Sequence, residues 1–142
     1  MPKALQLFIT WAPTATGIIA LYIAYVQLSS ANMSLNAANT ISISQESRQI
    51  ADEIFDAADD LVRLNNAYDR YGDFIAHAGY LASQNQLPVS YWEYLKADFC
   101  RLYEEINFQV WYARNINADH IKLLYPDFDR MKDHPKCKQR KL

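Results

Sequence analysis

The sequence has few of the residues that interrupt regular structure. Its 142 residues include 3 glycines and 5 prolines, whereas turn-rich β folds use both residue types often. This scarcity favours long helices.

There are only two cysteines, Cys100 and Cys137, which is too few for a disulfide framework. The prediction favours two unpaired thiols, with Cys100 as a small buried residue, and leaves a single bridge open.

Charge is missing from the N-terminal third of the chain. No charged residue occurs between Lys3 and Glu46, and residues 7–26 are mostly apolar. A helix of about 20 residues is about 30 Å long, which matches the thickness of a bilayer's hydrocarbon core. The sequence therefore predicts a transmembrane helix within residues 1–28, kinked at Pro13. The residues expected to span the membrane are Leu7, Phe8, Ile9, Trp11, Pro13, Ile18, Ile19, Leu21, Ile23 and Val26.

Two other interpretations of this segment stay open. A cleaved signal peptide would use Lys3 as its basic start and Ser29 and Ala31 before the cleavage site, although the apolar run is long for one. The segment could also be the buried core helix of a soluble protein. The preferred interpretation is a single-pass protein of the bacterial inner membrane, with the water-facing part on the cytoplasmic side.

The remaining sequence predicts an all-α fold beyond the N-terminal transmembrane helix. Residues 29–45 are uncharged but polar and are expected to form a juxtamembrane extension. Residues 46–125 carry two apolar stripes, the first in a helix over about residues 45–82 and the second over about residues 91–114. Joined by a short loop, the stripes predict a long antiparallel helical hairpin, followed by a short third helix over residues 119–125.

The two stripes have alternating spacings of three and four residues. Ser90 and Glu93 match a capping box at the start of the second helix. The first stripe consists of Ile50, Ile54, Ala57, Leu61, Leu64, Tyr68, Tyr71, Ile75 and Ala78. The second consists of Trp92, Leu95, Phe99, Leu102, Ile106 and Val110.

The C-terminal residues 126–142 form a basic tail that is expected to be flexible. The whole chain has a net charge of −2, which argues against nucleic acid as the main partner. The hairpin should return the tail towards the membrane, so its bases are predicted to contact anionic lipid headgroups. A disordered tail in solvent is the alternative. The predicted lipid-contacting residues are Lys132, Lys136, Lys138, Arg140 and Lys141.

The sequence offers little for catalysis. No phosphate-binding loop, nucleophile elbow or catalytic triad can be found. The only candidates for metal ligands are His77, His120, His134 and Cys137, with Asp73 one turn before His77. Their spacing matches no known site. We therefore expect no catalytic, metal-binding or cofactor-binding residues, no small-molecule substrate and no enzymatic activity.

The number of aromatic residues points instead to a protein partner. Tyr91, Tyr94, Tyr103, Phe108, Trp111 and Tyr112 exceed what one face of a hairpin can bury. Such a surplus predicts a homo-oligomer or a membrane-associated protein partner that covers the rings.

Residues 5–80 consist of an apolar segment, a polar stretch and then a long acidic helix. This layout resembles that of small uncharacterised bacterial and phage single-pass membrane proteins of unknown function. The resemblance concerns layout only and carries no functional residue with it. The first hypothesis is a membrane-anchored protein that self-associates or binds another protein. The alternative is a small sensory or regulatory protein that transmits a signal through a continuous helix, and an enzyme is third.

Overall fold

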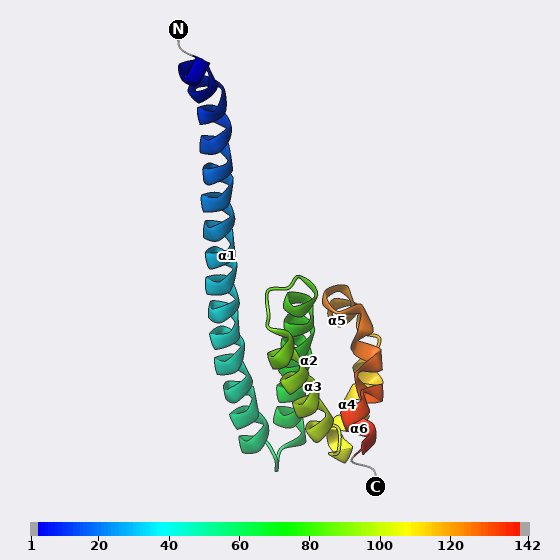
Figure 1. Cartoon of the computed structure of the whole chain (residues 1–142). Helices are drawn as coiled ribbons and strands as arrows, with labels where there is room; N and C mark the ends of the chain where they lie inside the picture. Colours follow the sequence, from blue (N-terminus) through cyan, green and yellow to red (C-terminus); the bar gives the residue numbers. More distant parts are fainter. Residues whose placement is uncertain (1–2, 140–142) are drawn as a thin grey trace. The chain divides into compact units, whose positions relative to one another are not determined.

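The computed structural model describes residues 3–139 and the side chains of residues 19–138. The chain divides into two compact units, Met1–Leu35 and Asn36–Leu142, and α1 contributes to both. The described residues form only helices, which confirms the all-α class (Figure 1). They are α1 (Lys3–Asp56), α2 (Leu61–Ser83), α3 (Val89–Leu102), α4 (Ile106–Asn115), α5 (Asp119–Leu124), the 3-10 helix η1 (Pro126–Asp133) and α6 (Pro135–Gln139).

The prediction of a transmembrane helix is contradicted. Within the described part of the chain, no helix combines the length and the apolar character that crossing a membrane requires. Among the residues whose side chains are described, the apolar run extends only from Ile19 to Val26, and the polar residues Gln27, Ser29 and Ser30 follow it in the same helix. The single-pass, inner-membrane location is therefore wrong as well.

The predicted membrane-spanning residues fall into two groups. The side chains of Ile19, Leu21, Ile23 and Val26 are exposed on α1. The others lie outside the residues whose side chains are described, and so does the predicted kink at Pro13. These others are Leu7, Phe8, Ile9, Trp11, Pro13 and Ile18.

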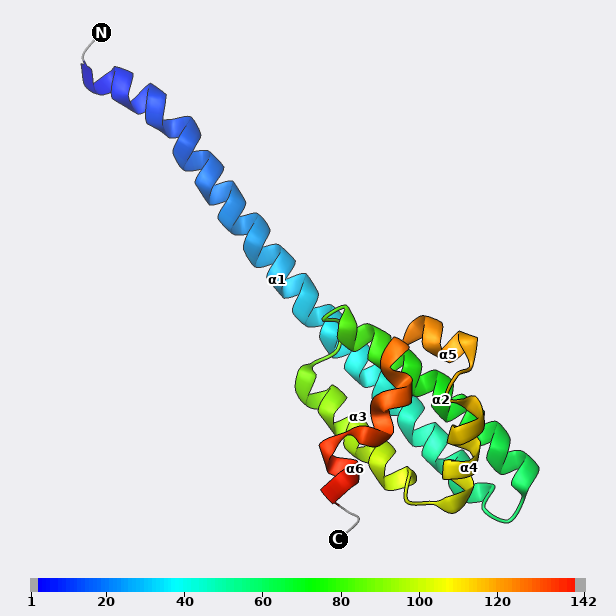
Figure 2. The same ribbon diagram turned by 90° about the vertical axis from the view of Figure 1, so that its right-hand side faces the viewer.

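In the second unit, residues 36–56 of α1 lie beside α2 and α3, and the later helices cover the opposite side of that pair (Figures 1 and 2). Ile43 and Ile50 of α1 are buried against this unit. The predicted antiparallel pairing of the two apolar stripes is found between α2 and α3, which a short loop joins. The pair is one part of a larger bundle rather than an isolated hairpin.

The first predicted helix is in fact two helices, because the chain turns between Ala57 and Asp60. Asp60 caps α2, and its Oδ1 accepts hydrogen bonds from the backbone N–H groups of Val62 at 3.0 Å and Arg63 at 3.1 Å. An ion pair between Arg70 of α2 and Glu53 of α1 links the two helices. Leu61, predicted to be in the stripe, is consequently 64% exposed at the turn.

The end of α2 near Ser83 is confirmed, and Asn85 explains it. Asn85 has a φ of 56°, the left-handed conformation in which asparagine is one of the few residues tolerated. Its N–H donates to the carbonyl of Ala82, and the Gln86 N–H donates to the carbonyl of Leu81. These two bonds satisfy the last carbonyls of α2 and reverse the chain.

The second predicted helix is also two helices, separated by the turn Tyr103–Glu105. The turn changes which face of the chain is buried, so that Ile106 and Val110, predicted to be core, are exposed. Phe108, Trp111 and Tyr112 are buried in their place. The predicted capping box is not formed, because α3 begins after Pro88 without a side-chain cap.

The aromatic core, the group of rings around Phe99 and Phe108, occupies the centre of the second unit. Both rings are fully buried, and their centroids lie 5.6 Å apart in an edge-to-face arrangement. The core therefore uses much of the aromatic surplus that was predicted to need a partner. The other rings packed around this pair are Tyr68, Tyr71, Tyr103, Trp111, Tyr112 and Phe128.

Two glycines of α2 allow the later helices to come close. A Cβ atom at Gly72 would lie 2.6 Å from the Trp111 ring, and one at Gly79 would lie 2.6 Å from the Tyr125 ring. Both distances are far below van der Waals contact. Gly72 and Gly79 therefore mark close contacts between α2 and the later part of the chain.

The cap at Asp60 can be tested by substitution. We expect Asp60→Ala to lower the free energy of unfolding by about 1 kcal/mol, because two N–H groups at the start of α2 lose their acceptor. Urea denaturation followed by circular dichroism measures the change. Asp59→Ala is the matched control, since it removes the same charge without touching the cap. Equal destabilisation by both variants would contradict this role for Asp60.

Candidate functional site

Residues 126–139, here called the C-terminal segment, are folded onto the second unit and are not a flexible tail. Phe128 and Met131 of η1 are buried. The Tyr112 hydroxyl donates a hydrogen bond to the carbonyl oxygen of Phe128 at 2.6 Å. The bases Lys132, Lys136 and Lys138 remain exposed, whereas Arg140 and Lys141 lie outside the described residues. The contact of these bases with lipid headgroups stays a prediction.

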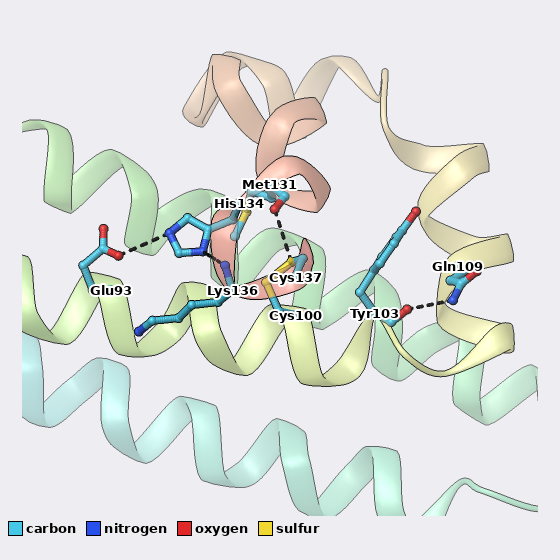
Figure 3. The surroundings of a disulfide bond; sticks show 8 residues. All are labelled: Glu93, Cys100, Tyr103, Gln109, Met131, His134, Lys136 and Cys137. Carbon is cyan, nitrogen blue, oxygen red and sulfur yellow. Dashed lines mark hydrogen bonds and ion pairs between the residues drawn. A yellow bond between two sulfur atoms is a disulfide. The ribbon is translucent and has the colours of Figure 1, made fainter. Parts of the chain in front are cut away.

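A disulfide holds the C-terminal segment in place. It joins Cys100 of α3 to Cys137 of α6, whose Cα atoms are 4.8 Å apart (Figure 3). The preferred prediction of two unpaired thiols is therefore wrong. The bridge closes a loop over a sequence separation of 37 residues, for which loop-closure entropy gives a stabilisation of about 4 kcal/mol.

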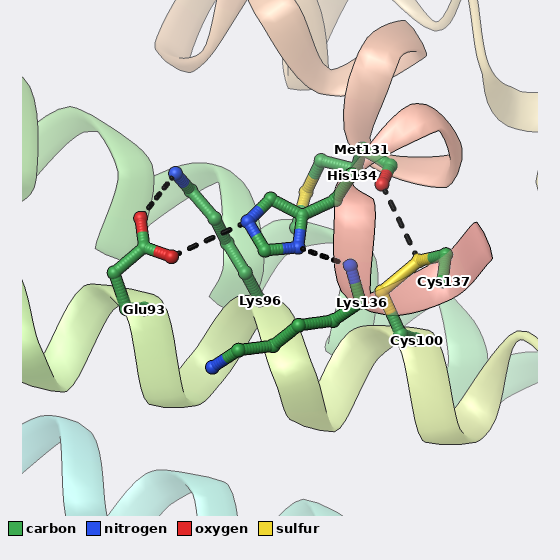
Figure 4. Close-up of polar contacts among 7 residues, drawn as sticks. All are labelled: Glu93, Lys96, Cys100, Met131, His134, Lys136 and Cys137. Carbon is green, nitrogen blue, oxygen red and sulfur yellow. Dashed lines mark hydrogen bonds and ion pairs between the residues drawn. A yellow bond between two sulfur atoms is a disulfide. The ribbon is translucent and has the colours of Figure 1, made fainter. Parts of the chain in front are cut away.

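A second attachment of the segment is polar (Figure 4). His134 Nε2 lies 3.3 Å from Glu93 Oε2, and Lys96 Nζ lies 2.8 Å from Glu93 Oε1. His134 Nδ1 accepts the N–H of Lys136 at 3.4 Å, which assigns the proton of a neutral imidazole to Nε2 and directs it at Glu93. The contact thus forms whether or not the imidazole is charged.

The residues considered as metal ligands do not converge. His120 pairs with Asp73 at 3.4 Å, His134 pairs with Glu93, and Cys137 is in the disulfide. His77 is exposed. In the part of the chain that is described, no group of three His, Cys, Asp or Glu side chains is placed to hold a metal ion.

A groove of about 280 Å³ opens between α1, α2 and α3. Three elements position its walls. Ser47, Ala51 and Ile54 come from α1, Tyr71 from α2, and the remaining side chains from α3 and the turn after it. That last group consists of Asp98, Arg101, Leu102 and Glu105.

Tyr71 gives the groove its distinctive chemistry. The residue is 4% exposed, and its hydroxyl has no hydrogen-bond partner within the described structure. Leaving such a group unsatisfied costs about 1–3 kcal/mol. Burial raises the pKa of Tyr71 well above its ordinary value, and the charge of Asp98 raises it further. The hydroxyl is therefore neutral at physiological pH and can both donate and accept.

The rim of the groove carries an excess of negative charge. Arg101 is ion-paired with Asp98, with Nη1 and Oδ1 3.5 Å apart. No ion pair involves Glu105 among the described side chains. The groove thus has two carboxylates against one guanidinium, next to apolar walls.

The first unit presents a different surface, the apolar section of α1, which we define as residues 19–35. Each of its nine large apolar side chains is between 44% and 73% exposed. The section has no charged residue. The nine are Ile19, Leu21, Tyr22, Ile23, Tyr25, Val26, Leu28, Met33 and Leu35.

Sequence reasoning placed residues 19–28 in a membrane-spanning helix and residues 29–35 in a polar extension, and it missed the groove. Tyr71 falls in the first apolar stripe, so its spacing indicates a core residue and says nothing of its unpaired hydroxyl. Asp98, Arg101 and Glu105 are ordinary charges at a helix surface. Only the turns after α1 and α3, which the sequence does not mark with glycine or proline, bring these residues together.

Comparisons with known proteins give no relationship. No family model, curated protein or solved structure matches the chain.

The contact between Glu93 and the C-terminal segment predicts a pH dependence. The hydrogen bond from Lys96, followed by the contact with His134, lowers the pKa of Glu93 below its ordinary value. A carboxylate whose pKa is lower in the folded state than in the unfolded state stabilises the fold at any pH above its unfolded pKa, which is about 4.3. This stabilisation is lost as the pH falls through the pKa of the folded state. We expect the free energy of unfolding to fall more steeply below about pH 4.3 for the wild type than for Glu93→Gln.

Urea denaturation of both proteins at pH 7 and at about pH 3.5 measures this difference. Glu46→Gln on α1 is the control and should retain the wild-type slope. Identical pH dependence in Glu93→Gln and the wild type would contradict the assignment.

Proposed function

We propose that the chain is an interaction protein, in which the apolar section of α1 associates with the same section of a second copy. The observation that supports this most directly is the exposure of nine large apolar side chains on a single uncharged stretch of helix. Exposed apolar surfaces of this extent mark sites of association. Residues 19–26 carry apolar side chains on all sides of the helix, and a helix of this kind is usually buried.

The spacing within the section suits a second copy. Leu21, Tyr25, Leu28, Asn32 and Leu35 alternate at four and three residues, the spacing at which two helices pack side by side. Asn32 occupies an inner position of this seam, where a buried asparagine fixes the register between two identical helices. With no charge from residue 19 to residue 35, two identical sections can approach without electrostatic repulsion.

The aromatic residues of α4 do not offer a competing surface for association. The aromatic surplus that would otherwise suggest a partner for α4 is largely buried in the aromatic core. Self-association therefore does not depend on Phe108, Trp111 or Tyr112.

A single substitution tests the proposal. The purified chain should have at least twice the mass of a 16.4 kDa monomer in light scattering coupled to size exclusion. Leu28→Glu should weaken the association at least tenfold, because it places an unpaired charge in the seam.

Ser30→Glu is the matched control, since Ser30 lies about 200° around the helix from Leu28 and also receives a glutamate. The control should keep the wild-type mass. A wild-type protein that is monomeric at all concentrations, or a Leu28→Glu variant with unchanged mass, would contradict the proposal.

A further inference from the structure

The groove between α1, α2 and α3 has features that self-association does not use. A buried tyrosine hydroxyl normally has a hydrogen-bond partner, yet that of Tyr71 has none in the described structure. Tyr71 lines the groove, together with Asp98 and Arg101. The hydroxyl is itself buried, so a molecule that enters the groove has to displace the side chains over the hydroxyl to supply the missing partner.

The charged residues that line the groove favour a cationic ligand. Arg101 is paired with Asp98, so its guanidinium is already neutralised. The Glu105 carboxylate is in no ion pair among the described side chains. An anion would meet this excess negative charge, whereas a cation would balance it.

The apolar walls of the groove favour a ligand with a small apolar part. Ala51, Ile54 and Leu102 form an apolar surface beside the hydroxyl. The volume, about 280 Å³, is at the lower end for small-molecule sites. It suits a compact body of a few methylene groups rather than a large cofactor.

We propose that this groove binds a primary ammonium group on a short apolar stem. The ammonium donates a hydrogen bond to the Tyr71 hydroxyl oxygen, the Glu105 carboxylate balances its charge, and the stem lies against Ala51, Ile54 and Leu102. This chemistry is shared by free alkylamines and by the side chain of a lysine on another protein.

Titration of the full chain with hexylammonium chloride, followed by chemical-shift changes in two-dimensional NMR, tests the proposal. Saturable shifts at Tyr71 and Glu105 are expected. Hexanol and sodium hexanoate have the same stem without the positive charge, so they should bind at least fivefold more weakly. Absence of saturable binding by hexylammonium, or equal binding by hexanoate, would overturn the proposal.

Two variants test the residues. Tyr71→Phe removes only the unpaired hydroxyl and should fold normally, yet bind hexylammonium about fivefold more weakly, the effect of one lost hydrogen bond. Tyr68→Phe is its matched control, because Tyr68 is also buried but does not line the groove. Glu105→Gln should weaken binding as well, whereas Glu104→Gln, next to it in sequence, should not. Unchanged binding in Tyr71→Phe would overturn the proposal.

A parallel titration with Nα-acetyl-lysine methylamide distinguishes the two sources of the ammonium group. Binding at least as tight as that of hexylammonium would support a protein lysine as the natural ligand. Binding of hexylammonium alone would support a free amine. The result does not depend on the oligomeric state, so failure of self-association and failure of this site can be told apart.

Discussion

Phe99 and Phe108 lie at the centre of the second unit, and the positions of the surrounding helices follow from the packing of rings around this pair. The two residues are nine positions apart and belong to different helices, so the rings can meet only if the chain turns between them. That turn, Tyr103–Glu105, directs the buried face of α4 inwards. It also sends the chain on to η1, where Phe128 joins the same cluster. The disulfide and the Glu93–His134 contact then hold the C-terminal segment on the core.

The aromatic core changes how the exposed surfaces should be interpreted. Most of the rings that a simple hairpin would leave in solvent are inside the unit, whereas Phe55, Tyr80 and Tyr94 remain exposed. The apolar section of α1 is in the opposite situation. Its side chains are exposed, and no charge lies among them. In the described structure the case for a partner therefore rests on residues 19–35 rather than on α4.

Much of the second unit could be predicted from sequence, because the apolar spacing records which side of each helix is buried. The boundaries come from other signals, because the polar run of residues 83–86 before Pro88 predicts the end of α2, and Asn115 and Asn117 separate α5 from the preceding helix. The break at Ala57–Asp60 was missed because Ile50, Ala57 and Leu64 keep their seven-residue spacing across it. Its only local signal is Asp60, one acid among several. The break after Leu102 has neither glycine nor proline, and packing around Phe108 favours it over a continuous helix.

The spacing of apolar residues could not predict contacts between residues that are far apart in the sequence. The pairing of Cys100 with Cys137 depends on the fold of the C-terminal segment, which buries only a few apolar residues and looked like a basic tail. The groove depends on the unpaired hydroxyl of Tyr71, whereas the sequence identifies the residue only as part of an apolar stripe. The transmembrane prediction failed for a different reason. It depended on the whole apolar run of residues 7–26, whereas the described side chains cover only residues 19–26 of that run, and polar residues follow these in the same helix.

In the proposed function, residues 19–35 form the surface for association, while the aromatic side chains of α4 are buried within their own unit. Amide hydrogen exchange of the purified chain, measured by mass spectrometry at about 1 μM and about 100 μM, tests both parts at once. Amides of residues 19–35 should exchange more slowly at the higher concentration, and those of residues 106–115 should be strongly protected and unchanged. Equal rates for residues 19–35 at the two concentrations, or concentration-dependent protection of residues 106–115, would contradict the account.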